Sequence, residues 1–355
     1  MIRSTLVWLA TVPLFLPRIC FSPASAHAQD TGPGGAPVAE EATHPPPPSI
    51  PAIGVRNTKY LEVPASAKGP AVDAAKGYRL QDLGLGLYMI TDNIYQSMFL
   101  VYDGGVVVVD APPNYAARIP QAIAEVTSKP ITHVIYSHSH SDHIGGTKSL
   151  GGRPIIIAQQ ETLRLLQRAG DTKRPLPTLT FSDRYTLRVG QQVLELSYYG
   201  DAHEPGNIFI NAPAQRVLMV VDVVFPGWMP WRRFAVAHDV PGHLAQVELI
   251  RKMNWQRLVG GHVARTGSHA DVEVQAEFNR DLKQAAAAAL AATQPAVGMD
   301  RQDTANPWAV YDNYIDRVAA ACVHALEPKW STRLAAFDVW VWDQCYAMEQ
   351  SLRID

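Results

Sequence analysis

The segment SHSHSDHIGG (residues 137–146) concentrates side chains that bind metal ions. It places His138, His140, Asp142 and His143 directly after the apolar run ITHVIY. At the end of an extended strand, side chains two positions apart point the same way, so His138 and His140 should converge. Asp142 and His143 follow the turn into the next helix and can face a second point nearby. Imidazole and carboxylate groups together suit Zn²⁺ and related divalent ions. The alternative is a polar loop in which Asp142 caps the helix, but three histidines within six residues disfavour it.

Three more polar residues lie at or near the carboxyl ends of apolar stretches. His203 follows QVLELSYYG, Asp222 lies within VLMVVDVVF, and His262 ends RLVGGH. Sites in α/β proteins collect their ligands at the carboxyl ends of strands. Asp222 is the most informative, because a carboxylate among valines needs a cation or several hydrogen-bond donors. We therefore expect these residues to complete one site with the first segment.

Strand-like and helix-like stretches alternate from Gly77 onward, in two successive blocks. Strands are predicted at 78–91, 97–105, 106–113, 131–137, 154–158, 185–189, 192–200, 207–212, 216–225 and 257–262, helices at 115–128, 160–170 and 241–253, and an exposed loop at 171–184. This order predicts two packed sheets with helices outside, an α/β sandwich.

The order of the first segment, His203, Asp222 and His262 resembles the metallo-β-lactamase superfamily over roughly residues 77–267. The resemblance implies an α/β fold, the four-layer αββα sandwich, with a dinuclear metal site. By this resemblance His138, His140 and His203 hold one zinc, Asp142, His143 and His262 hold the second, and Asp222 bridges the two. Two Zn²⁺ are the implied cofactors, although iron and manganese occupy related sites.

A pair of metal ions favours hydrolysis. Two cations that share a water lower its pKa toward neutrality, and they also polarise a substrate carbonyl. Asp142, with a free carboxylate oxygen, could orient the hydroxide and pass a proton to the leaving group. Asn207, in the segment HEPGN, could donate a hydrogen bond to the oxyanion. The alternative for Asn207 is a turn residue beside Gly206.

The aspartate at position 222 bears on the substrate. In the superfamily, β-lactamases carry cysteine or serine there, whereas lactonases, thioester hydrolases of the hydroxyacylglutathione type and several phosphodiesterases carry aspartate. The resemblance therefore implies a member of the second group, and an apolar wall after Asp222 would suit a lactone, an ester or a similar carbonyl compound more than a phosphodiester. Trp228, Trp231 and Phe234 are predicted to bind the substrate as an apolar wall, or else they pack their loop onto the sandwich. A β-lactamase-like amide hydrolase and a mononuclear iron oxygenase of the persulfide dioxygenase type are the alternatives.

The N-terminus reads as an export signal followed by a linker. Residues 1–28 combine Arg3, an apolar run and a small-residue cleavage site, which predicts a signal peptide and a periplasmic or secreted protein. The run Leu6–Leu16 is too short to span a bilayer, so no stable membrane anchor is expected. Residues 29–76 are predicted as a proline-rich tether. The net charge of −2 argues against nucleic-acid binding, so the expected partner is a small-molecule substrate.

Residues 268–355 are predicted as a helical extension rich in alanine and aromatic residues. Its aromatic end, WSTRLAAFDVWVWDQCYAM, suggests a homodimer surface. Cys322 and Cys345 form a disulfide or remain two buried thiols, and the sequence leaves both readings open.

Overall fold

The structure is a computed structural model that describes residues 60–355. The predicted signal peptide (1–28) and the tether up to residue 59 lie outside this range. Within the described residues, packed structure is present before the expected start at Gly77. A short 3-10 helix, η1 (Ala65–Ala67), buries Ala67, whose carbonyl accepts a hydrogen bond from Trp228 Nε1 at 3.0 Å. The end of the predicted tether therefore belongs to the packed structure.

The first sheet has seven strands, ordered along the chain from β1 to β7. They are β1 (Arg79–Gly84), β2 (Leu87–Thr91), β3 (Gln96–Tyr102), β4 (Gly105–Val109), β5 (Ile131–Ile135), β6 (Ile155–Gln159) and β7 (Leu179–Phe181). The pairs from β1 to β4 are antiparallel, and those from β4 to β7 are parallel. β7 corrects the prediction of a loop over 171–184, because three residues are too few to show a strand period.

The second sheet has five strands in the order β12-β11-β10-β9-β8. They are β8 (Arg184–Val189), β9 (Gln192–Ser197), β10 (Phe209–Ala212), β11 (Val217–Val220) and β12 (Arg257–Val259). β11 pairs with β12 in parallel, and the other pairs are antiparallel. The two sheets share one apolar core, in which Met89 and Val107 of the first sheet join Leu194 and Met219 of the second.

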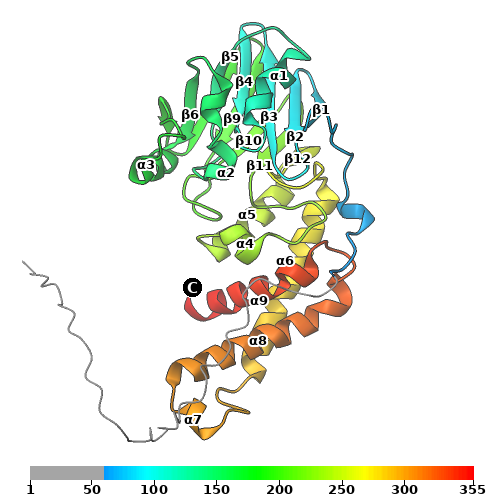
Figure 1. The fold of residues 1–355 in the computed structure, drawn as a ribbon, viewed down its shortest axis with the longest axis vertical. Helices are drawn as coiled ribbons and strands as arrows, with labels where there is room; N and C mark the ends of the chain where they lie inside the picture. Colours follow the sequence, from blue (N-terminus) through cyan, green and yellow to red (C-terminus); the bar gives the residue numbers. More distant parts are fainter. Residues whose placement is uncertain (1–59) are drawn as a thin grey trace, which may run out of the picture. The chain divides into compact units, whose positions relative to one another are not determined.

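Helices cover the outer faces of both sheets (Figure 1). α1 (Ile119–Ala124) and α3 (Gln160–Ala169) pack on the first sheet through Ile119, Ile123 and Leu166. α5 (Val240–Lys252) and α6 (His269–Ala292) pack on the second through Val247 and Val272. The layers therefore run helix, sheet, sheet, helix, and the predicted αββα sandwich is confirmed.

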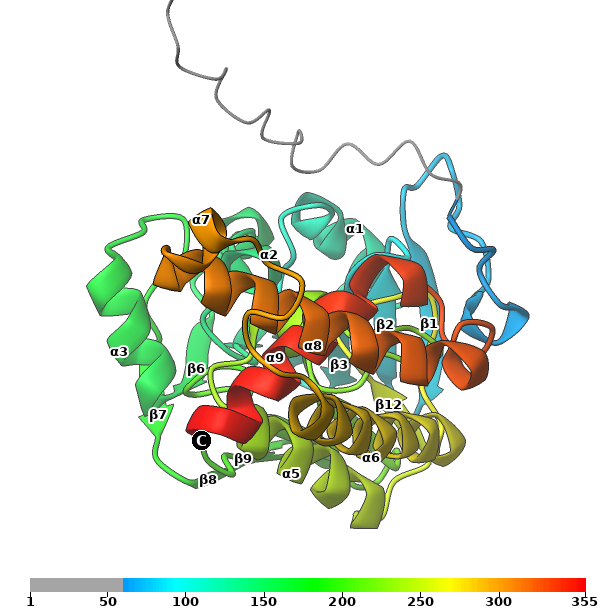
Figure 2. The ribbon, with the colours of Figure 1, turned by 90° about the horizontal axis from the view of Figure 1, so that it is seen from below.

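The C-terminal extension is helical, as predicted. α6, α7 (Arg301–Thr304), α8 (Pro307–Trp330) and α9 (Phe337–Ile354) follow the sandwich, and α6, α8 and α9 pack together (Figure 2). Their shared core contains Phe278, Trp330 and Met348. No helix within residues 60–355 is long and apolar enough to cross a membrane.

A disulfide between Cys322 of α8 and Cys345 of α9 answers the question that the sequence left open. Both cysteines are fully buried, and they lie 23 positions apart in the sequence. Closing such a loop removes conformational freedom from the unfolded chain.

Replacing both cysteines by alanine should lower the free energy of unfolding by roughly 2–4 kcal/mol. Denaturant titration of the oxidised wild type and of the double variant Cys322→Ala/Cys345→Ala measures this difference. The control is the fully reduced wild type, which should unfold near the midpoint of the variant. Equal midpoints for the oxidised wild type and the variant would contradict the stabilising role.

Candidate metal centre

The predicted metal ligands all follow strands, and they come from both sheets. His138 and His140 lie in the loop after β5, and the short helix α2 (Ser141–Ile144) carries Asp142 and His143. The second sheet supplies the other three: His203 after β9, Asp222 after β11 and His262 after β12. α2 has no side-chain cap, so the alternative role of Asp142 as a helix cap is not realised.

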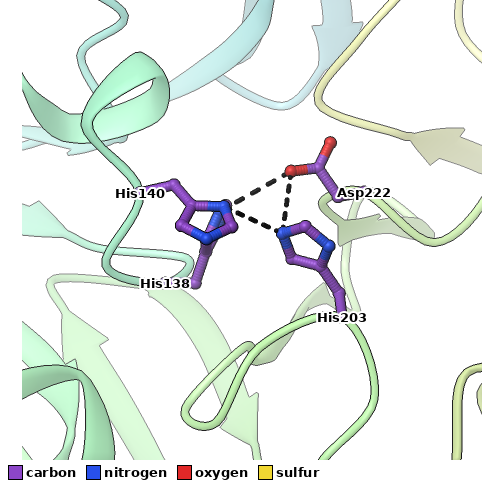
Figure 3. Close-up of side chains that lie close together, drawn as sticks. All are labelled: His138, His140, His203 and Asp222. Carbon is purple, nitrogen blue, oxygen red and sulfur yellow. Dashed lines mark hydrogen bonds and ion pairs between the residues drawn. The ribbon is translucent and has the colours of Figure 1, made fainter. Parts of the chain in front are cut away.

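The first cluster consists of His138, His140, His203 and Asp222 (Figure 3), one ligand atom of each lying within 4.8 Å of the others. Asp222 Oδ2 lies 3.2 Å from His203 Nε2 and 3.6 Å from His138 Nε2. His203 Nε2 lies 3.0 Å from His140 Nδ1. Ligands at about 2.0–2.1 Å from a tetrahedral zinc are separated from one another by roughly 3.3 Å. The donor atoms of this cluster therefore fit a bound divalent cation.

The second cluster consists of Asp142, His143 and His262, again within 4.8 Å. His143 Nε2 lies 3.0 Å from His262 Nε2. Asp222 contacts this cluster too, with Oδ1 3.0 Å from His262 Nε2 and Oδ2 3.3 Å from His143 Nε2. A carboxylate in contact with histidines of both clusters is the arrangement that the bridging hypothesis requires.

Three of the five histidines direct one ring nitrogen to the clusters and the other to a second partner. The second contacts are His138 Nδ1 to Ser137 Oγ (2.9 Å), His140 Nε2 to Glu204 Oε1 (3.3 Å) and His262 Nδ1 to the Ile94 carbonyl (3.1 Å). Such contacts orient metal-binding rings and increase the basicity of the metal-binding nitrogen. For these three rings, the protein thus fixes which nitrogen faces the centre. His143 Nδ1 lies 4.0 Å from Asp110 Oδ2, which is too far for a hydrogen bond.

Asp110 and Glu204 both contact the loop that carries His138 and His140, and neither was predicted from the sequence. Asp110 directly follows β4, is fully buried, and accepts a hydrogen bond from the Ser137 amide at 2.8 Å. Burial raises its pKa to about 6. Glu204 accepts hydrogen bonds from the amide and the hydroxyl of Ser139, both at 2.9 Å. Asp110 carries the signal that singled out Asp222, a carboxylate at the end of an apolar strand, whereas no sequence signal marks Glu204.

The electrostatics of the clusters bear on cation binding. Burial opposes the charge of His143, but the nearby carboxylates, Asp222 first, outweigh it and raise the pKa of His143 to about 9, so this ring must lose a proton to bind a cation. Burial lowers the pKa of His203 to about 3, so its ring is neutral at pH 7. Burial opposes the charge of Asp222, but His262, His143 and His203 outweigh this effect and hold its pKa well below its usual value. The buried Nε2 of His138 has no hydrogen-bond partner. A cation at the centre would bind these neutral rings and this carboxylate, and would satisfy that nitrogen.

A cavity of about 680 Å³ opens beside the cluster. One side is polar and includes Asp142, Asp222 and His262. The other side is apolar and includes Trp228 and Trp231, whose contact with a substrate stays a prediction. The cavity has the size and the mixed lining of a small-molecule site.

Phe234 does not line this cavity, which corrects its predicted role in the substrate wall. Its side chain is fully buried and packs against His243, with ring centroids 5.4 Å apart, and against the core of the helical extension. The alternative reading, in which the aromatic residue packs its loop, holds for Phe234.

Asn207 also lies outside the cavity lining, so the structure gives no support for its predicted oxyanion role. Its side chain is buried, and Nδ2 donates a hydrogen bond to the Val221 carbonyl at 2.9 Å. Val221 directly precedes Asp222, whose backbone has a φ of 64°. Asn207 therefore stabilises the backbone that presents Asp222.

Replacing Asp222 by alanine should remove bound metal and hydrolytic activity together, because both clusters lose a shared contact. We expect activity to fall by at least about 100-fold. Elemental analysis after dialysis and a turnover assay measure the two effects, with Asp103→Ala in an exposed turn as the matched control. A variant that keeps both metal and activity would exclude the bridging role of Asp222.

Glu204→Gln should weaken metal binding by about 10–100-fold, because the amide lacks the charge that orients His140. Competition with a chelator measures the affinity. Glu195→Gln on β9, which lies outside the centre, is the control and should match the wild type. Unchanged affinity in Glu204→Gln would show that Glu204 only packs the loop.

Comparison with known proteins agrees with this geometry. The sequence model of the metallo-beta-lactamase superfamily matches residues 91–292. The chain is 28% identical over 179 residues to 2,4-dinitroanisole O-demethylase subunit alpha of Nocardioides sp., covering 44% of this chain and 55% of that one. It is 28% identical over 145 residues to a hydroxyacylglutathione hydrolase of Prochlorococcus marinus, covering 40% and 54%. The chain thus spans about half the length of these relatives.

Two further proteins are similar to part of this chain. The type 2 metallo-beta-lactamase of Bacillus cereus is 28% identical over 118 residues, covering 32% of this chain and 44% of that one. The solved metallo-beta-lactamase from Pontibacter korlensis shares the fold at a TM-score of 0.50 and 16% identity, covering 57% of this chain and 99% of the other. The family match extends over more than half of the chain and contains every ligand of the two clusters. The protein therefore belongs to the metallo-β-lactamase superfamily, and it carries His/Asp clusters that could hold metal ions.

Proposed function

We propose that this protein is an exported dinuclear zinc hydrolase that opens a lactone, an ester or a similar carbonyl compound. The observation that carries the proposal is the contact of Asp222 with histidines of both clusters, at 3.0 to 3.6 Å. Two adjacent clusters favour two ions over one, because a single ion in the first would leave Asp142, His143 and His262 without a cation. Five imidazoles and two carboxylates are a donor set that zinc prefers.

When bound, the two ions supply a hydroxide near neutral pH and polarise the substrate carbonyl. Asp142 lines the cavity with a side chain that is 43% exposed, so its carboxylate can hold a proton and deliver it to the leaving group. Tyr95 also lines the cavity, where its ring packs 4.7 Å from that of His262. Burial and the charge of Asp142 raise the pKa of Tyr95, so its hydroxyl stays protonated. Tyr95 is thus the candidate hydrogen-bond donor in place of Asn207.

The apolar side of the cavity favours a carbonyl substrate with apolar substituents over a phosphodiester. Aspartate at position 222 favours the lactonase and thioester hydrolase group over the β-lactamases. The similarity to a protein named hydroxyacylglutathione hydrolase is consistent with this choice. Amide hydrolysis of the β-lactamase kind is the second candidate, and the similarity to a type 2 metallo-beta-lactamase supports it.

Export rests on the predicted signal peptide at 1–28, which lies outside the described residues. The disulfide between Cys322 and Cys345 supports it independently, because such bonds persist in oxidising compartments. The expected partner is a small-molecule substrate.

Elemental analysis of the purified mature protein should give about two zinc ions per chain. Chelation should abolish activity, and added zinc should restore it. A panel of lactones and esters should be turned over faster than nitrocefin, a β-lactam. One iron per chain would overturn the dinuclear hydrolase, and preferential turnover of nitrocefin would select the second candidate.

A further inference from the structure

The apolar side of the cavity is built in part by the C-terminal extension. Trp340 of α9 lines the cavity together with Trp231, and their rings meet edge to face with centroids 6.5 Å apart. Trp340 lies outside the residues that the superfamily match covers. The extension therefore reaches the space in which a substrate would bind.

The extension also forms hydrogen bonds with the loop 227–236, which supplies other residues of this apolar wall. The Met229 amide donates a hydrogen bond to the Ala335 carbonyl, and the Ala335 amide donates to the Gly227 carbonyl, both at 3.0 Å. Gln344 of α9, which is fully buried, donates from Nε2 to the Pro230 carbonyl at 2.8 Å. Its Oε1 accepts a hydrogen bond from the Phe234 amide at 2.8 Å. The position of the wall thus depends on α9.

The held loop contains a strained backbone turn. In α4 (Arg232–Val236), the φ angles of Arg233, Phe234 and Ala235 lie between 53° and 58°. The left-handed conformation is unfavourable for residues that carry a Cβ. Such strained conformations persist where contacts with the surrounding structure hold them in place, often at ligand-binding sites. This turn places Ala235 and Val236 in the cavity lining.

The charges near the wall indicate which kind of substituent it can bind. Arg232 and Arg233 are the cations of this loop, but both lie near Asp343, at 3.3 and 3.9 Å, and their guanidinium groups lie over Trp340 and Tyr346. Within residues 60–355, no lysine or arginine lines the cavity. The wall can therefore bury apolar surface but offers no free cation for an anionic substituent.

We infer that the C-terminal extension is the specificity element of the enzyme. Trp340 and Trp231 bind a bulky apolar substituent, an aryl group or a medium-length acyl chain, on the substrate whose reacting carbonyl lies at the metal centre. The inference rests on the proposed function, because it assumes that the substrate carbonyl reaches the clusters. The volume of about 680 Å³ accommodates such a substituent beside the reacting group.

Binding of linear carboxylates, which resemble the product of lactone or ester hydrolysis, tests this inference without turnover. Calorimetry on the full-length mature protein with its metal compares butyrate, hexanoate, octanoate and decanoate, and 4-phenylbutyrate probes an aryl group. We expect the affinity to rise at least tenfold from butyrate to decanoate or to 4-phenylbutyrate, because added apolar groups leave water for the wall. The ligand that gains more identifies the type of substituent.

In Trp340→Ala, the rise in affinity from butyrate to decanoate or to 4-phenylbutyrate should fall to less than threefold, and the metal content should not change. Trp308→Ala is the matched control, because Trp308 is an exposed tryptophan of the same extension that does not line the cavity. Val236→Asn, at a partly exposed position of the wall, should also reduce the gain and serves as the second variant if Trp340→Ala does not fold.

The outcomes separate this inference from the proposed function. Affinity that does not depend on chain length or on the aryl group, or a gain that survives in both wall variants, would overturn the inference. If the rise in affinity depends on Trp340 but no lactone or ester is turned over, the wall does bind apolar substituents and the proposed reaction is wrong.

Discussion

The carboxylate of Asp222 is a buried negative charge on which four histidine rings converge, at 3.0 to 3.6 Å. An unpaired charge in such a place would be strongly destabilising. Its compensation requires loops that follow β5, β9, β11 and β12 to end at one point. Asp222 reaches that point with a left-handed backbone conformation. Asn207 donates a hydrogen bond to the preceding carbonyl, that of Val221, and the Gly260 carbonyl accepts a hydrogen bond from the Asp222 amide at 3.1 Å. Much of the local structure thus serves the placement of one side chain.

The sequence predicts this centre well because its candidate ligands form a pattern that can be recognised without knowing the tertiary contacts. His203, Asp222 and His262 each interrupt or end an apolar stretch, and strand ends meet at one edge of a sheet. No comparable sequence pattern indicates where the side chains of Asn207 and Phe234 point. Asn207 lies four residues after a ligand, yet its side chain turns to the backbone at Val221 rather than to the cavity. The direction of one side chain depends on packing that residue spacing does not encode.

The substrate wall was predictable only in the part that is local in sequence. Trp228 and Trp231 follow Asp222 within ten residues, so proximity to the site could be expected. Trp340 lies far along the chain and reaches the cavity only because α9 docks on the loop through Gln344. The left-handed turn of α4 has no sequence signal either, since it contains neither glycine nor asparagine. Tertiary contacts, rather than local preference, determine this side of the site.

Each cluster takes ligands from both sheets, and this links the chemistry to the stability of the fold. The first combines His138 and His140 with His203 and Asp222, and the second combines Asp142 and His143 with His262. The same loops already meet through the Ile208 amide, which donates to the Ser137 carbonyl at 2.9 Å. A cation bound in either cluster therefore joins the two halves of the sandwich. Because the unfolded chain presents no such set of ligands, every bound ion favours the folded state by a free energy that grows with the logarithm of its affinity. The residues that would activate water are thus also residues through which metal would hold the sheets together.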